Sequence, residues 1–155
     1  MNHQFKVNIN NNQESVKVPK GIRMLVRRCC KAVLHEENRE TVGNVNIVFS
    51  ENQSLSELSG NNLAQENEEL FVMQPLDKEQ ENRKHLGDVY IALESAMQRS
   101  KTYHNSFEAE VVYLTAHAVF LLLGYRDCSV FEKDILEYKE HRIIHELGMT
   151  YQGHI

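Results

Sequence analysis

The stretch Phe107–Asp127, FEAEVVYLTAHAVFLLLGYRD, is the most apolar segment of the chain and limits the possible folds more than any other feature. Its apolar residues recur at helical spacing, at Val111, Leu114, Ala118, Leu121 and Leu122. This pattern predicts a largely buried helix. On such a helix His117 and Leu121 lie one turn apart on the same face, so these two positions largely decide the chemistry available there.

Capping signals delimit this helix and the one that follows it. Asn105 and Glu108 have the spacing of a capping box, and Gly124 favours the left-handed conformation that ends a helix. Ser129 and Glu132 repeat the capping-box spacing further on. They precede the apolar positions of a last amphipathic helix, which are Ile135, Leu136, Ile143, Ile144 and Leu147.

The rest of the chain alternates between strand and helix patterns. Strands are predicted at 5–9, 45–49, 70–73 and 89–93, with a possible short return strand at 16–18. Helices are predicted at 19–34, near 55–58 and at 94–101. The resulting order, β-α-β-α-β-β followed by helices, is typical of an α+β domain in which helices cover a small mixed sheet. We expect a single domain over 1–155.

Composition excludes several classes of protein. The formal net charge of −5 provides no overall attraction to nucleic acid or anionic membranes, although a local basic surface is compatible with it. No apolar run is long enough for a transmembrane helix, and the N-terminus lacks the apolar core of a signal peptide. Three cysteines without metal-binding spacing favour the reducing cytoplasm.

Four cations lie mainly on one side of the helix predicted at 19–34: Arg23, Arg27, Arg28 and Lys31. A solvated polar face accounts for them most simply. A stripe that contacts RNA phosphates is the alternative.

Three segments together resemble one known family. They are HLGDVYIALE, NSFEAEVVYLTAHAVFLLLGYRD and ILEYKEHRIIHELGM, and the similarity extends roughly from Val45 to Met149. On these segments the chain is similar to the YbeY family of bacterial metal-dependent endoribonucleases, which act in rRNA maturation and ribosome quality control. The resemblance implies a zincin-like α+β fold with a four-stranded sheet, and rRNA or the ribosome as partner.

The metal ligands of that family are only partly present. The family motif supplies three histidines, which fall here on His117, Leu121 and Asp127. A catalytic zinc takes three protein ligands and keeps one position open for water, and leucine has no lone pair to donate. We therefore expect zinc to be absent or substoichiometric, with His117 and Asp127 as a vestigial or weak site.

Further departures lie around the same site. The family's loop arginine is replaced by Leu63, a motif glycine by Ala118 and the aspartate of GYD by Arg126. The segment EELFVMQP lacks the Thr-Asp pair and the serine of the family's strand. The replaced residues all belong to the family's active-site motifs, whereas the segments that build the fold are retained. This pattern indicates a degenerate family member with impaired catalysis.

Several alternatives stay open at this point. His104, Cys128 or the pair His141 and His145 are possible substitute ligands, and His117 could instead be a core histidine bonded to the backbone. The chain could accordingly be an active zinc endoribonuclease, a non-catalytic module that binds RNA or the ribosome, or a structural subunit. DNA is not expected as a partner, and the oligomeric state is open.

Overall fold

The computed structural model describes residues 5–39, 43–58, 69–74 and 85–153. The elements are β1 (Phe5–Asn12), α1 (Ile22–Glu36), β2 (Gly43–Ser50), α2 (Asn52–Leu58), β3 (Leu70–Met73), β4 (His85–Ala92), α3 (Leu93–Tyr103), α4 (Phe107–Leu122) and α5 (Val130–Glu146). This is the predicted order of strands and helices. The position of the family arginine, Leu63, lies outside the described residues.

The strands form one mixed sheet in the order β1-β2-β4-β3. β1, β2 and β4 run parallel, and β3 pairs antiparallel with β4 at one edge of the sheet. The return strand predicted at 16–18 is wrong. There, the Gln13 side chain bonds both backbone polar groups of Val16, at 2.8 and 2.9 Å, and closes the segment as a turn.

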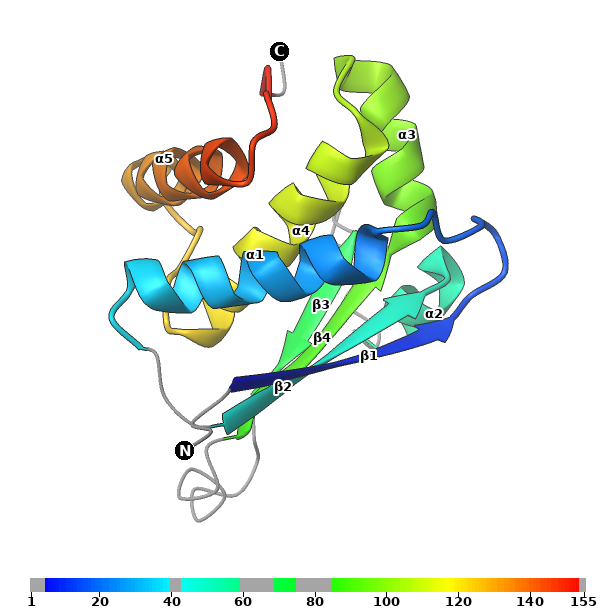
Figure 1. Cartoon of the computed structure of the whole chain (residues 1–155), viewed down its shortest axis with the longest axis horizontal. Coiled ribbons are helices and arrows are strands. Elements are labelled where there is room, and N and C mark those ends of the chain that lie inside the picture. Colours follow the sequence, from blue (N-terminus) through cyan, green and yellow to red (C-terminus); the bar gives the residue numbers. More distant parts are fainter. Residues whose placement is uncertain (1–4, 40–42, 59–68, 75–84, 154–155) are drawn as a thin grey trace.

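Helix α4 is the central helix of the fold. It packs on β3 and β4, and α1, α3 and α5 all contact it. Figure 1 shows α1 and α4 on the same side of the sheet, with α5 beyond them at the periphery. The core lies between this layer and the inner side chains of the strands, such as Val45, Ile47, Phe49, Val89 and Ile91, all fully buried.

The C-terminal end of α4 lies close to β4 at Gly87. A Cβ atom on this glycine would lie 2.7 Å from a methyl carbon of Leu122 and 2.6 Å from the carbonyl oxygen of Met73. Only a residue without a side chain allows such an approach. The contact therefore fixes the end of α4 against the sheet, next to the loop that carries Asp127.

The ends of α4 and α5 agree with the predicted capping residues, except at the start of α4. Ser106 caps α4 by accepting from the backbone N–H of Ala109 at 3.0 Å, so the prediction of Asn105 as the cap was wrong by one residue. The capping box of Ser129 and Glu132 is confirmed. Gly124, with φ of 106°, directly follows the C-cap of α4, as its sequence position predicted.

One core prediction in α5 is also wrong. Leu136, Ile143 and Ile144 are buried as expected, but Ile135 is 37% exposed. The helix instead buries Glu140, which is 1% exposed, because that residue shares the inner face with Leu136 and Ile143. In the described part of the chain, no helix combines the length and the apolar character that crossing a bilayer requires.

Candidate functional site

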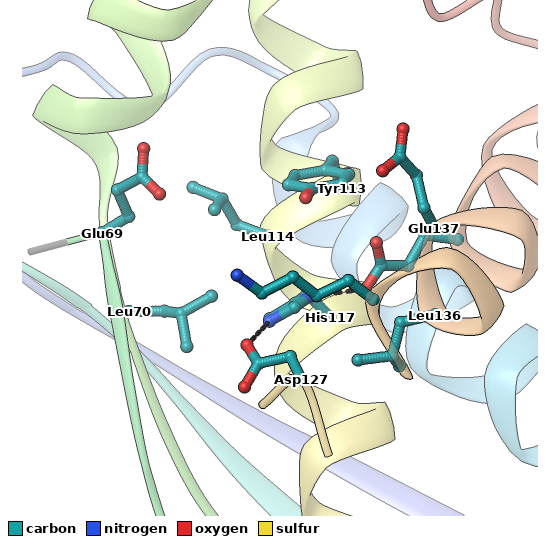
Figure 2. Close-up of a pocket in the computed structure, with 10 residues that line it drawn as sticks. Glu69, Leu70, Tyr113, Leu114, His117, Asp127, Leu136 and Glu137 are labelled. Atoms are coloured by element: carbon teal, nitrogen blue, oxygen red, sulfur yellow. Dashed lines mark hydrogen bonds and ion pairs between the residues drawn. The ribbon is translucent and has the colours of Figure 1, made fainter. Parts of the chain in front are cut away.

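A pocket of about 220 Å³ lies between β3, α4 and α5. Figure 2 shows Glu69 and Leu70 on the strand side, Tyr113, Leu114 and His117 on α4, and Leu136 and Glu137 on α5. Asp127, from the loop after α4, closes one end of the pocket, and Lys133 and Glu140 complete its lining. The pocket thus brings together His117 and Asp127, the two residues predicted from the sequence.

His117 lies between two carboxylates. Its Nδ1 atom is 2.5 Å from Oε2 of Glu140, and its Nε2 atom is 3.2 Å from Oδ2 of Asp127. The side chain is 12% exposed, and the ring of Tyr113 stacks on it at a centroid distance of 6.1 Å. The histidine is therefore held by side-chain carboxylates, which corrects the alternative that its bonds go to the backbone.

These two carboxylates favour the imidazolium form. Burial on its own lowers the pKa of His117, but the hydrogen bond and charge of Glu140 and the charge of Asp127 outweigh it, so the pKa is raised above its ordinary value. Burial also raises the pKa of the Glu140 carboxyl, which His117 only partly offsets. Both shifts favour a proton on the pair, where Nδ1 and Oε2 lie within hydrogen-bond distance.

The donors among the described residues fall short of a catalytic zinc site. In this part of the chain, only Nε2 of His117 and the Asp127 carboxylate converge, and Leu121 occupies the next turn of α4 with no donor atom. Across 5–39, 43–58, 69–74 and 85–153, no three His, Cys, Asp or Glu side chains form a group able to hold a metal ion. Two donors fall one short of the three that a catalytic zinc takes.

The proposed substitute ligands lie elsewhere. His104 is the C-cap of α3 and lines a different pocket, thirteen residues before His117 along the chain. Cys128 is exposed, and its sulfur accepts from Arg126 at 3.8 Å. His141 and His145 share α5, where the ring of His141 packs edge-on against Tyr151.

Glu140 is the member of the site that the sequence analysis missed. It follows Leu136 by four residues and precedes Ile143 by three, so it lies on the apolar stripe of α5. A carboxylate at such a position needs a buried partner, because an unpaired buried charge is strongly unfavourable. The place of Glu140 on the apolar stripe of α5 was therefore the signal available in the sequence. The structure identifies His117 as its partner.

A second ionic cluster surrounds Glu110, two turns before His117 on α4. Glu110 is fully buried and accepts from Nε of Arg99 at 3.0 Å, from Nδ2 of Asn105 at 2.9 Å and from the Tyr151 hydroxyl at 3.0 Å. Arg99 also binds Glu69, on the wall of the pocket. The cluster therefore holds α3, α4, the segment before β3 and the C-terminal segment together.

The α1 cations do not share this pocket. Arg23, Arg27, Arg28 and Lys31 are exposed on the outer side of α1, and none of them is among the pocket-lining residues. Among the described residues of that lining, Lys133 is the single Lys or Arg, beside four carboxylates, those of Glu69, Asp127, Glu137 and Glu140. The structure thus separates the cationic surface from His117.

Comparisons with known proteins agree on one family. The family model described as "Endoribonuclease YbeY" matches residues 8–148. A relative from Caldanaerobacter subterraneus subsp. tengcongensis, named endoribonuclease YbeY, is 32% identical, with 94% of this chain and 99% of the relative covered. A relative of the same name from Desulforamulus reducens is 29% identical, covering 92% of this chain and 97% of its own length.

One solved structure shares the fold. The solution structure of TM1509 from Thermotoga maritima is similar with a TM-score of 0.54 and 17% sequence identity, over 91% of this chain and 88% of that one. This similarity supports the α+β fold, with helices on a four-stranded mixed sheet, that the sequence resemblance implies.

Proposed function

Because the chain belongs to the YbeY family, we propose that it acts in rRNA maturation in the cytoplasm as an RNA-binding member whose zinc-dependent cleavage is lost or impaired. The observation that carries this proposal is the arrangement around His117. Both of its ring nitrogens face carboxylates, and the helix presents Leu121 where a second histidine would stand. The family scaffold is kept, while the donor set is incomplete.

The charge distribution supports binding away from the pocket. Four carboxylates line the pocket, so the phosphates of RNA are repelled from it. Arg23, Arg27 and Lys31 follow each other at intervals of four residues along the exposed side of α1, with Arg28 beside them. No ion pair or hydrogen bond within the described residues engages these four cations, which leaves them available for phosphate oxygens.

Metal content and cleavage are the direct test. We expect wild-type protein purified without chelators to contain much less than one zinc per chain by elemental analysis. It should leave a single-stranded RNA intact under conditions in which a YbeY relative with three histidines cleaves it. Stoichiometric zinc, or cleavage that EDTA abolishes, would contradict the proposal.

Restoring the ligands gives a positive result to measure. The double substitution Leu121→His with Asp127→His supplies three histidines in the family's spacing. We expect this variant to bind zinc with about one ion per chain, whereas the matched variant Leu123→His with Asp127→His, whose new histidine lies off the ligand face, should not. Equal zinc binding by the two variants would show that the ligand positions are misassigned.

RNA binding is tested by removing charge from α1. Arg23→Gln, Arg27→Gln and Lys31→Gln in one chain should weaken binding of a single-stranded RNA and reduce its dependence on salt by about 0.7 in slope per lost phosphate contact. The control removes three exposed lysines elsewhere, Lys6, Lys17 and Lys101, and changes the net charge equally. Equal losses in both variants would mean that α1 has no specific role.

One observation favours the alternative of an active metalloenzyme. Nε2 of His117 and Oδ2 of Asp127 lie 3.2 Å apart, and Glu140 holds Nδ1, as carboxylates commonly do behind a metal-bound histidine. A third donor from outside the described residues would complete such a site. The zinc measurement on the wild type separates this alternative from the main proposal.

A further inference from the structure

The exposed side of α1 carries cations that the helix itself does not balance. Residues 20–31 contain five lysines and arginines and no aspartate or glutamate. Acidic residues follow at the C-terminal end of the helix, and both of them are already paired. Glu36 binds Arg142 at 3.1 Å. Glu37 binds Lys139 at 2.9 Å. The positive charge along the rest of α1 is therefore available to an anionic partner.

One exposed apolar side chain lies in the middle of these cations. Met24 is 64% exposed, and Arg27 and Arg28 follow it by three and four residues. On a helix these two spacings place one arginine on each flank of Met24, one turn further along. Lys31 continues the row by another turn, and Arg23 precedes it. We call these five residues the α1 face.

The α1 face is a ridge with a fixed spacing of its side chains. The opposite side of the helix is fully buried in the core, at Ile22, Val26, Cys29, Cys30 and Val33. In Figure 1, α1 crosses in front of α4, and no other helix lies in front of it. Neither the pocket at His117 nor the pocket at His104 is lined by a residue of α1. Cations four residues apart on this ridge are thus held about 6 Å apart along the helix axis.

These properties favour an RNA double helix over a single strand. Proteins that bind single strands combine a charged groove with aromatic side chains on which the bases stack. The α1 face has neither feature, because it is a ridge and consists of four cations and a methionine. A double-stranded stem presents a wide, shallow minor groove that proteins recognise by its shape, its phosphates and its 2′-hydroxyl groups. A ridge with cations on both flanks fits such a groove.

We propose that the α1 face binds the minor groove of a double-stranded RNA stem. Arg23, Arg27 and Lys31 contact phosphates of one strand. Arg28 contacts the other strand, and Met24 lies against the riboses between them. This inference rests on the proposed RNA binding and names the form of RNA that binds. Because phosphates and sugars carry no sequence information, binding depends on the helical form of the RNA and not on its sequence.

An RNA hairpin and an unstructured single strand of the same length test the form of the RNA. Fluorescence anisotropy with the full chain at low salt should show the hairpin bound at least about fivefold more tightly than the single strand. A second hairpin with the same stem length and a different sequence should bind as tightly as the first. Equal or tighter binding of the single strand, or a clear preference for one hairpin, would overturn this inference and leave the proposed RNA binding intact.

Removal of charge locates the hairpin on α1. The variant with Arg23→Gln, Arg27→Gln and Lys31→Gln should bind the hairpin more weakly, with a salt dependence lower by about 0.9 in slope per lost phosphate contact. The control with three exposed lysines removed elsewhere should keep the preference for the hairpin. If the α1 variant binds both RNAs as the wild type does, α1 is not an RNA site. That result would overturn this inference and the proposed RNA binding through α1 together.

Met24→Ala separates contact with the groove from contact with phosphates alone. We expect this variant to bind the hairpin about threefold more weakly, because it loses apolar contact with the riboses. The salt dependence should stay the same, since no charge is removed. Val130→Ala removes an exposed apolar side chain from α5 and should leave hairpin binding unchanged. Wild-type affinity of Met24→Ala, or an equal loss in Val130→Ala, would overturn the placement of α1 in the groove.

An anionic membrane is the other large polyanion that could meet this face. A helix that lies in a membrane surface buries a broad apolar side among the lipids. The apolar side of α1 is already buried in the protein, and the α1 face offers only Met24. Vesicles of phosphatidylglycerol should therefore not retain the chain in cosedimentation. Retention that is lost in the α1 charge variant would show that the face binds membranes, and it would overturn the proposal.

Discussion

The two ionic clusters on α4 differ in the nature of their cation. Near the start of the helix, buried Glu110 is paired with Arg99, a guanidinium that is charged at any ordinary pH. Two turns later, Glu140 and Asp127 flank His117, which is cationic only when it is protonated. The first cluster balances its charges permanently, whereas the second depends on a proton. The difference indicates a structural role for the Arg99 cluster and a charge balance at His117 that varies with pH.

The largest expected effect comes from breaking the permanent pair. Arg99→Met should lower the free energy of unfolding by about 3–5 kcal/mol, because it leaves the fully buried Glu110 carboxylate without its cation. Urea denaturation measures this loss. Lys101→Met removes an exposed cation from the same helix and should change stability by less than about 0.5 kcal/mol. A small loss for Arg99→Met would remove the structural distinction between the two clusters.

A smaller effect is expected at the second cluster. Glu140→Gln keeps the shape of the side chain but removes the charge that favours the imidazolium, so the pKa of His117 should fall, and stability should drop by about 1–3 kcal/mol. NMR titration of the His117 ring and urea denaturation measure the two quantities. Glu146→Gln, an exposed carboxylate in the last turn of the same helix, is the matched control and should leave both nearly unchanged.

The pH dependence of stability is the most subtle difference between the clusters. The folded-state pKa of His117 is raised, so its stabilising contribution is complete below the unfolded-state pKa of about 6.5 and is lost as the pH rises through the folded-state value. The raised pKa of Glu140 acts in the same direction. Wild-type stability should therefore decline over this range, and His117→Gln should flatten the profile. A profile that is identical in the two proteins would show that His117 is not protonated preferentially in the folded state.

Leucine at position 121 is compatible with a fold that is stable without metal. Leu121 is partly buried and packs against the core, as the apolar pattern of the helix requires. We expect EDTA to leave the thermal midpoint of the wild type unchanged within about 1–2 °C, because the proposed function predicts that folding does not depend on a bound metal. In the Leu121→His and Asp127→His variant with bound zinc, EDTA should instead lower the midpoint measurably. A large decrease in the wild type would identify a metal that contributes to folding.

The sequence by itself determined the order of the elements, the central helix and the family. Helical periodicity, glycine at helix ends and strand alternation are local signals, and they act within a few residues of where they are read. The replacement of metal ligands at Leu121 and Asp127 was predicted for the same reason, because the family motif has fixed spacing, and it stays a prediction. The capping residue was wrong by one position, since Asn105 and Ser106 both offer a suitable oxygen and only one adopts the capping geometry.

Only the tertiary structure decided how the charged residues are paired. Glu140 binds His117, which lies 23 residues away in the sequence, and Glu69 binds Arg99, which lies 30 residues away. Local sequence patterns extend over only a few residues, so they cannot predict these pairs. Ile135 fits the apolar pattern of α5, yet the helix buries Glu140 in preference, because the buried carboxylate has a partner in His117. The pairing of buried charges depends on how α5 packs against α4. This packing therefore determined which residues form the candidate site and which side of α5 is exposed.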